Sequence, residues 1–184
     1  MESPEVMTKT KWMIDRAHSE IGFKVKHLMF ANVRGNFKEF DARVFTIGND
    51  FMSASIEVRI NAASVDTRIE QRDDHLRSAD FLDAQQFKEI RFTGNTFVAT
   101  NREQLYEMYG ELTMRGVTNE IKLDVEIGGI VKDPYGVEKA LFTVDGKINR
   151  KDWGLNYHSI LETGGLVVSE EVWIHCDVQL IKQP

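Results

Sequence analysis

Three residue types that support hydrolytic chemistry occur close together near the N-terminus, Asp15, His18 and Ser19. A nucleophile needs a base within hydrogen-bond reach and a third group that orients this base. Side chains within one short turn rarely adopt that arrangement and more often bind the turn's own backbone. The sequence therefore favours a structural role for His18 and Ser19. The competing hypothesis is a small hydrolase or isomerase that uses His18, Asp73 or Arg150.

Histidine and cysteine are scarce, and their positions form no recognised site. The five histidines include no pair with the spacing of a metal motif such as His-x-x-x-His or His-Glu-x-x-His. The single cysteine, Cys176, excludes an intrachain disulfide, and its alternating apolar surroundings favour a buried hydrophobe over a nucleophile. The sequence therefore predicts no metal site, no cofactor, no catalytic residue and no enzymatic activity.

The length of 184 residues is sufficient for one domain with a full hydrophobic core, and we assign residues 11–184 to it. Residues 1–10 are expected to form a disordered N-terminal extension. The formal net charge of −6, with basic residues interspersed among acids, argues against binding of nucleic acid or anionic lipid surfaces. Because no apolar leader and no run of membrane-spanning length occurs, we expect a cytoplasmic protein.

Most of the chain alternates apolar and polar residues with a period of two, the pattern of half-buried β-strands. A phase change within residues 32–47 predicts a β-bulge near Glu39–Phe40. Short turns join the strands, and no strand–helix–strand repeat occurs. Such a chain protects its sheet edges by closing into a barrel or by stacking as a sandwich. The expected strands cover residues 11–15, 21–28, 32–47, 53–60, 89–98, 104–115, 120–131, 139–149 and 167–182.

The inward faces of these strands are almost wholly apolar and carry glycines at Gly35, Gly110 and Gly146. Glycine on an inner face marks either a sharp bend or space that a side chain would otherwise fill. An eight-stranded barrel is just wide enough to be filled by side chains or to hold one small ligand. If the interior is hollow, its contents must therefore be apolar.

One segment departs from the strand pattern and predicts a helical insertion over about residues 66–86. Thr67 and Glu70 have the spacing of a capping box. Asp73 and Arg77 follow at i,i+4 with the acid first, which is the favourable order on a helix. The side chains expected to face the rest of the fold are Ile69, Leu76 and Phe81.

Five motifs occur in order along nearly the whole chain. They are W-x-I-D-x-x-H-S-x-I-x-F-x-V-x-H at 12–27, V-x-G-x-F at 33–37, S-V-D-T at 64–67 with R-D-x-H-L-x-S-x-D-F at 72–81, G-x-L-T-M-x-G-V-T at 110–118, and I-N-R-x-D-W-G at 148–154. Together they resemble the YceI-like family of lipid- or polyisoprenoid-binding proteins. The resemblance covers about residues 11–182.

The resemblance implies an all-β fold, an eight-stranded antiparallel lipocalin-like β-barrel with a helical segment beside a long apolar tunnel. It also implies a non-catalytic function. The expected ligand is a polyisoprenoid, an isoprenoid quinone or a fatty-acyl lipid, bound for storage, transport or sequestration. Because family members commonly pair, a homodimer is expected as well. A filled barrel that serves only as an interaction module is the remaining alternative.

The ligand-binding residues are predicted from the inward strand positions and from the ends of the strands. His27 is either a hydrogen-bonded core residue or a polar anchor for a ligand headgroup, because apolar pockets usually contain a few placed polar groups. Phe81 and Trp153 lie near irregular chain, where a barrel mouth would be, and Arg150 and Asp152 are expected to form an ion pair at a corner. The predicted ligand-binding set is Phe23, Val25, His27, Phe37, Ile56, Val58, Phe81, Phe92, Met108, Leu112, Met114, Val125, Phe142, Val144 and Trp153.

Overall fold

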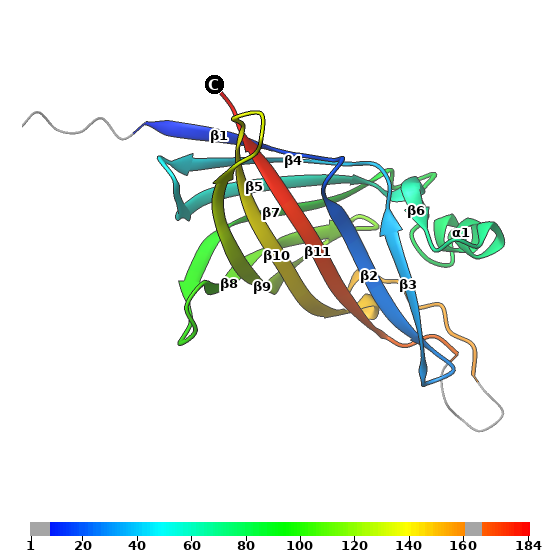
Figure 1. Cartoon of the computed structure of the whole chain (residues 1–184). Helices are drawn as coiled ribbons and strands as arrows, with labels where there is room; N and C mark the ends of the chain where they lie inside the picture. Colours follow the sequence, from blue (N-terminus) through cyan, green and yellow to red (C-terminus); the bar gives the residue numbers. More distant parts are fainter. Residues whose placement is uncertain (1–7, 161–166) are drawn as a thin grey trace, which may run out of the picture.

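Antiparallel strands make up most of the protein (Figure 1). The computed structural model describes residues 8–160 and 167–184. Its strands are β1 (Lys9–Ile14), β2 (Glu20–His27), β3 (Ala31–Phe37), β4 (Phe40–Ile47), β5 (Asp50–Asn61), β6 (Val65–Asp66), β7 (Glu89–Ala99), β8 (Leu105–Met114), β9 (Val117–Lys132), β10 (Glu138–Asn149) and β11 (Glu171–Lys182). Two 3-10 turns, η1 (Ala62–Ser64) and η2 (Arg150–Trp153), and the α-helix α1 (Glu70–Arg77) complete the described elements.

Eight of the strands close into a barrel in the order β1-β4-β5-β7-β8-β9-β10-β11. Closure occurs where β1 pairs with β11, with Trp12 opposite Lys182 and Ile14 opposite Leu180. The alternating apolar positions then face a common interior, as the period-two pattern requires. The predicted eight-stranded antiparallel barrel is therefore confirmed, and the sandwich alternative is not adopted.

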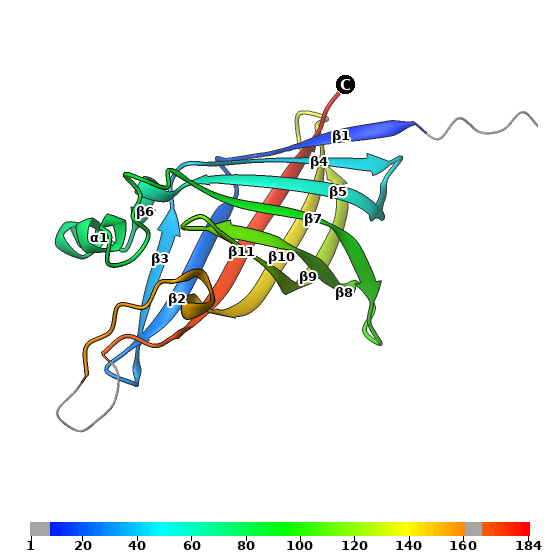
Figure 2. The ribbon, with the colours of Figure 1, turned by 180° about the vertical axis from the view of Figure 1, so that it is seen from behind.

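The strands β2, β3 and β6 extend one end of this barrel. β2 pairs with β11 over residues 173–177, next to the stretch of β11 that β1 occupies. β3 pairs with β2, and the short β6 pairs with β3. Figure 2 shows that the β2–β3 hairpin, α1 and η2 all lie at this extended end. The extension brings the irregular parts of the chain together around one opening of the barrel.

Two predictions for the N-terminal half of the chain are wrong. The expected bulge at Glu39–Phe40 is instead a break between β3 and β4, where the Glu39 N–H donates to the hydroxyl of Ser64 at 3.0 Å. Strand β1 begins at Lys9, and its first two residues pair with β4, so the expected disordered extension over residues 1–10 is too long by those residues. Residues 1–7 of that prediction lie outside the described part of the chain.

The predicted helix is real but short, and its predicted capping box is wrong. Ile69 is the N-cap of α1, it provides no side-chain cap, and it is 51% exposed rather than packed inward. Thr67 instead donates its hydroxyl and its backbone N–H to the buried carboxylate of Asp73, the latter at 2.8 Å. Arg77 pairs with Asp74 at 2.7 Å and not with Asp73. Asp73, in the first turn of α1, thus holds the residues that precede the helix in place.

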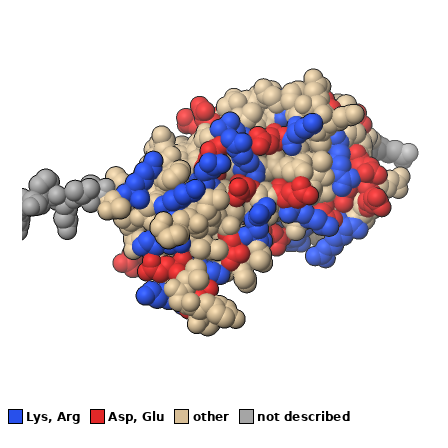
Figure 3. Space-filling view, turned by 90° about the horizontal axis from the view of Figure 1, so that it is seen from above, with Lys and Arg blue, Asp and Glu red and all other residues tan. Residues whose placement is uncertain are grey.

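The outer face of the barrel carries charges of both signs. In one view, Lys and Arg side chains alternate with Asp and Glu side chains over the surface (Figure 3). On adjacent strands, the Glu57 carboxylate pairs with Arg59 at 2.8 Å and with Arg91 at 3.0 Å. Among the described residues, no helix is long and apolar enough to cross a membrane.

Candidate ligand-binding cavity

A cavity of about 540 Å³ occupies the interior of the barrel. Side chains from β1 to β11 form its wall, and Leu76 and Phe81 from the helical insertion cover the end near α1. The wall is hydrocarbon apart from a few polar groups. The predicted residues that lie in this wall are Phe23, Val25, His27, Phe37, Ile56, Val58, Phe81, Phe92, Met108, Leu112, Met114, Val125, Phe142 and Val144.

Trp153 is the one predicted residue that does not line the cavity. It is buried, and its indole N–H donates to the backbone carbonyl of Leu112 at 2.8 Å. A buried indole needs such an acceptor, and the one that Trp153 finds is a strand carbonyl rather than a group in the interior. Trp153 therefore attaches η2 to β8. Its predicted part in ligand binding at the barrel mouth stays a prediction.

Inward glycines do not enlarge the cavity, because neighbouring apolar side chains cover them. A Cβ built on Gly110 would come within 2.5 Å of the Phe92 ring, and one built on Gly146 would meet the Leu123 side chain at 2.4 Å. Rings that cover glycines across neighbouring strands are a known device for stabilising sheets. The cavity is therefore the interior space that is left after these side chains have covered the glycines.

Three aromatic rings close the cavity near α1. His75, Phe81 and Tyr157 lie in mutual contact, with ring centroids 4.8 Å to 5.1 Å apart. His75 is held by Asp80, whose carboxylate lies 2.8 Å from Nε2. All three rings line the cavity. The aromatic cluster thus joins the helical insertion to the irregular segment after η2.

Arg150 is buried beside this cluster, with 3% of its surface exposed. Its guanidinium donates to the carbonyls of Leu155 at 2.5 Å, Ser169 at 2.9 Å and Val168 at 3.5 Å. The predicted ion pair with Asp152 does not form among the described residues. Burial lowers the pKa of the Arg150 guanidinium, and the carboxylate of Glu170 offsets part of this effect. Arg150 therefore holds three chain segments together at the end of the cavity.

His27 is the polar group of the wall that best fits a ligand anchor. Its backbone forms an isolated bridge with Val168, and its imidazole lines the cavity without a hydrogen-bond partner among the described residues. Apolar pockets usually orient their ligands through a small number of such groups. Arg72 also borders the cavity, and its guanidinium donates to the hydroxyl of Thr67 at 2.7 Å and to the Thr67 carbonyl at 2.8 Å.

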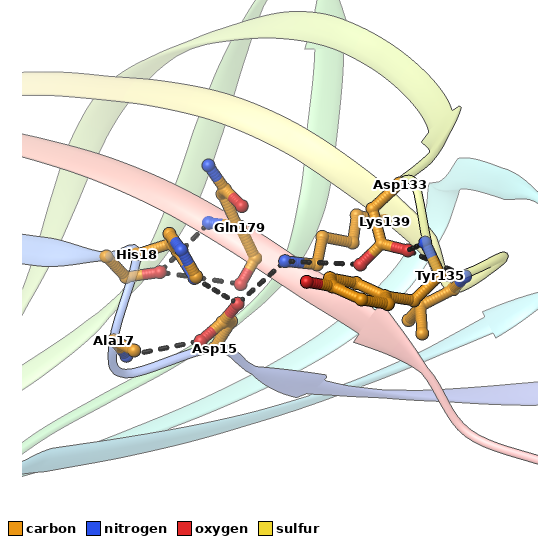
Figure 4. Close-up of polar contacts among 9 residues, drawn as sticks. Asp15, Ala17, His18, Asp133, Tyr135, Lys139 and Gln179 are labelled. Atoms are coloured by element: carbon orange, nitrogen blue, oxygen red, sulfur yellow. Dashed lines mark hydrogen bonds and ion pairs between the residues drawn. The ribbon is translucent and has the colours of Figure 1, made fainter.

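The residues of the catalytic hypothesis do not meet. His18 Nδ1 lies 2.7 Å from Asp15, and the same carboxylate pairs with Lys139 at 2.9 Å (Figure 4). Ser19 does not bond to His18 but accepts the Gln179 N–H at 3.0 Å. Asp73 binds Thr67, and Arg150 binds carbonyls, so neither contacts His18. The described residues contain no group of three or more potential metal ligands.

Two wall residues show where sequence patterns were informative and where they were not. Cys176 is buried in the wall, and burial raises the pKa of its thiol from 9.0 to about 12, as expected for a small hydrophobe rather than a nucleophile. His75 was not predicted to line the cavity. It lies on the short helix α1, whose sequence is mostly polar. The only signal in the sequence is Asp80, five residues later, whose carboxylate holds the His75 ring in one orientation.

The closed antiparallel barrel and the apolar cavity inside it define the class of small lipocalin-like β-barrel proteins. Residues 12–180 match the YceI-like domain, so the chain belongs to the YceI-like family. A UPF0312 protein of Staphylococcus epidermidis is 38% identical over 164 residues, covering 89% of this chain and 92% of that protein. A Campylobacter jejuni YceI protein of known structure is 32% identical over 100% of both chains, with a TM-score of 0.71.

A more distant structure supports the fold alone. It is described as a polyisoprenoid binding domain from Saccharophagus degradans implicated in plant cell wall breakdown. It is 15% identical, covers 94% of this chain and 98% of its own, and has a TM-score of 0.64.

Proposed function

We propose that this protein binds a long apolar chain non-covalently inside its barrel and thereby stores, transports or sequesters it. The observation that carries the proposal is the cavity of about 540 Å³ with an almost purely hydrocarbon wall. Protein interiors are normally packed with few voids larger than a water molecule. A space of this size, within the ~300–1,000 Å³ typical of ligand pockets, is best explained by an occupant.

The chemistry of the wall sets the class of ligand. Apolar burial contributes ~25 cal/mol per Å² of surface, so a chain that buries about 300 Å² gains roughly 7 kcal/mol before the cost of association. Polyisoprenoids, isoprenoid quinones and fatty-acyl lipids all offer such a chain. The Saccharophagus degradans domain, described as polyisoprenoid binding, has the same fold and supports this choice.

The polar groups of the wall support one orientation of that chain. His27 ends β2, Arg72 lies on α1 and Arg150 begins η2, and these elements lie at the extended end of the barrel (Figure 2). The aromatic cluster of His75, Phe81 and Tyr157 includes another residue of α1. A ligand with a polar head and an apolar tail would place its head there and its tail among the residues of β4, β5, β9 and β10. The proposed function is binding without catalysis, which requires only burial and one or two hydrogen bonds.

The experiment is a titration of the protein with a fluorescent prenyl or acyl chain, compared between two variants of β9. Val125 lines the cavity and Val131 faces solvent. We expect Val125→Phe to fill part of the space, to retain the melting temperature, and to weaken binding at least tenfold, whereas Val131→Phe should bind as the wild type does. Equal binding by the wild type and Val125→Phe would contradict the proposal, as would the absence of binding to every chain tested.

A further inference from the structure

The β2–β3 hairpin ends in a run of exposed apolar side chains. Leu28, Met29 and Phe30 are 50%, 65% and 86% exposed, and the first two adopt positive φ angles of 53° and 65°, which turn the chain tightly. Ile160, also 65% exposed, follows Ser159, which is linked through Val167 to the Leu28 N–H. These four residues are here called the apolar tip. The β2–β3 hairpin, whose turn contains the first three, projects from the extended end of the barrel (Figure 1).

Cations lie directly behind the apolar tip. Lys24, Lys26 and Arg34 occupy the outward positions of β2 and β3, and none forms an ion pair among the described residues. Lys24 and Arg34 are directly opposite each other across the hairpin. Like charges in this position destabilise a sheet, so their presence requires another explanation.

The acids nearest in the fold do not neutralise these cations. On or beside β11, Glu171 pairs with Lys147 at 3.4 Å and Glu170 pairs with Lys151 at 2.8 Å. Glu20, at the other end of β2, accepts from the side-chain amide of Asn36 at 3.5 Å. The indole of Trp173, on the adjacent strand β11, lies 5.2 Å from Lys24 Nζ and adds an aromatic side chain to the same face. A chain with a net charge of −6 therefore presents a local cationic face on one hairpin.

We propose that the apolar tip and the cations behind it dock this protein onto an anionic phospholipid bilayer. Apolar and aromatic side chains bury themselves at the headgroup boundary while Lys and Arg attract anionic lipids. The hairpin is suited to this role by position as well, because His27 at the end of β2 and Val168 beside it both line the cavity. Docking would place the opening of the barrel against the bilayer. The purpose of docking, exchange of a chain between membrane and cavity, rests on the proposed function.

The experiment is co-sedimentation of the protein with vesicles of equal parts phosphatidylcholine and phosphatidylglycerol. We expect binding that weakens with added salt and that is lost with pure phosphatidylcholine, because the cations act through the anionic lipid.

The variants separate the apolar tip from the cations. Phe30→Asp should abolish sedimentation. Tyr135→Asp, which changes an equally exposed aromatic residue in another turn, should leave it unchanged. The double variant Lys24→Gln/Lys26→Gln should weaken binding by about twenty- to thirtyfold, since each cation near an anionic surface contributes about fivefold.

Three results would overturn the docking proposal. They are wild-type protein that does not sediment with anionic vesicles, Phe30→Asp that sediments as the wild type does, and a concentration-dependent dimer that Phe30→Asp dissociates. The last would assign the tip to a second copy of the chain. Titration of Phe30→Asp with the fluorescent chain separates this test from the proposed function, because that variant should retain full chain binding inside the barrel.

Discussion

The ring of Phe23 lies across the inner face of Gly35 on the neighbouring strand. The two residues are direct partners in the β2–β3 ladder, and a Cβ built on Gly35 would come within 2.5 Å of Phe23 Cζ. The ring also packs against the tilted ring of Phe37, with centroids 5.7 Å apart, and it borders the cavity. The absence of a side chain at Gly35 therefore determines how far Phe23 extends into the space available to a ligand.

Gly35→Ala should reduce chain binding by displacing the Phe23 ring into the cavity. Overpacking of this kind costs about 1–3 kcal/mol of the free energy of unfolding. The measurement is a chain-binding titration together with urea denaturation. Adding Phe23→Leu to Gly35→Ala should restore binding, because the smaller side chain relieves the clash. Full affinity in the single variant would show that this part of the cavity is not occupied.

Leu76→Asp should destabilise the protein and loosen ligand retention together. Leu76 lines the cavity from α1, so the substitution places a carboxylate against hydrocarbon, at a cost of about 2–3 kcal/mol for the lost apolar burial alone. Ile69→Asp is the matched control, since that side chain is exposed at the start of the same helix. Ligand dissociation rates and thermal melts report both effects. If the two variants behaved alike, α1 would not cover the cavity.

Arg150→Ala should lower the free energy of unfolding by about 2–4 kcal/mol, because three carbonyls lose their donor in a buried site. Arg150→Lys should recover only part of this, since one ammonium group lacks the planar fork that reaches several acceptors. Urea denaturation provides the measurement, and Arg59→Ala on the outer face should be close to neutral. If the Arg150→Ala protein were as stable as the wild type, Arg150 would not have the proposed structural role, and the catalytic hypothesis for this residue would have to be tested.

His175 should add a small stabilisation that exists only at low pH. A hydrogen bond to Asp145 at 2.6 Å, with Asp177 nearby, raises the pKa of this imidazole above its usual 6.5. Because the folded-state pKa is raised, the contribution is fully present below about pH 6.5 and disappears as the pH rises through the folded-state value. The pair is exposed, so about a few tenths of a kcal/mol is expected. The difference in stability between wild type and His175→Gln, measured across pH, tests it, and an NMR titration of Asp145→Asn should show the raised pKa lost.

The barrel was predictable from the sequence because burial on one sheet face imposes a period of two. Val125 and Phe142, for example, could be placed inside from their alternation alone, since a slip of one residue would expose the whole apolar set. The ends of the barrel were less predictable. Trp153 and Arg150 are fixed by hydrogen bonds to backbone carbonyls of distant residues, and Thr67 is fixed by the carboxylate of Asp73 across a turn. No periodic pattern records such partners.

The cationic face of the β2–β3 hairpin was hidden from the sequence for a related reason. Along the chain, Lys24, Lys26 and Arg34 are interspersed with residues of other kinds, and the overall charge is negative. Only strand pairing places Lys24 beside Arg34, and only the ion pairs of Lys147 and Lys151 remove the neighbouring acids from consideration. Charge patterning in sequence is therefore a poor guide to charge patterning on a barrel.

Native mass spectrometry of the protein purified from its own host, followed by organic extraction and lipid analysis, shows whether the barrel holds an apolar chain. We expect a non-covalent adduct at one chain per barrel, whose mass matches a prenyl or acyl lipid found in the extract. The Val125→Phe protein, prepared in the same way, should carry much less of it. A protein that is empty from its host and that also takes up no prenyl or acyl chain when offered one would contradict the proposed function.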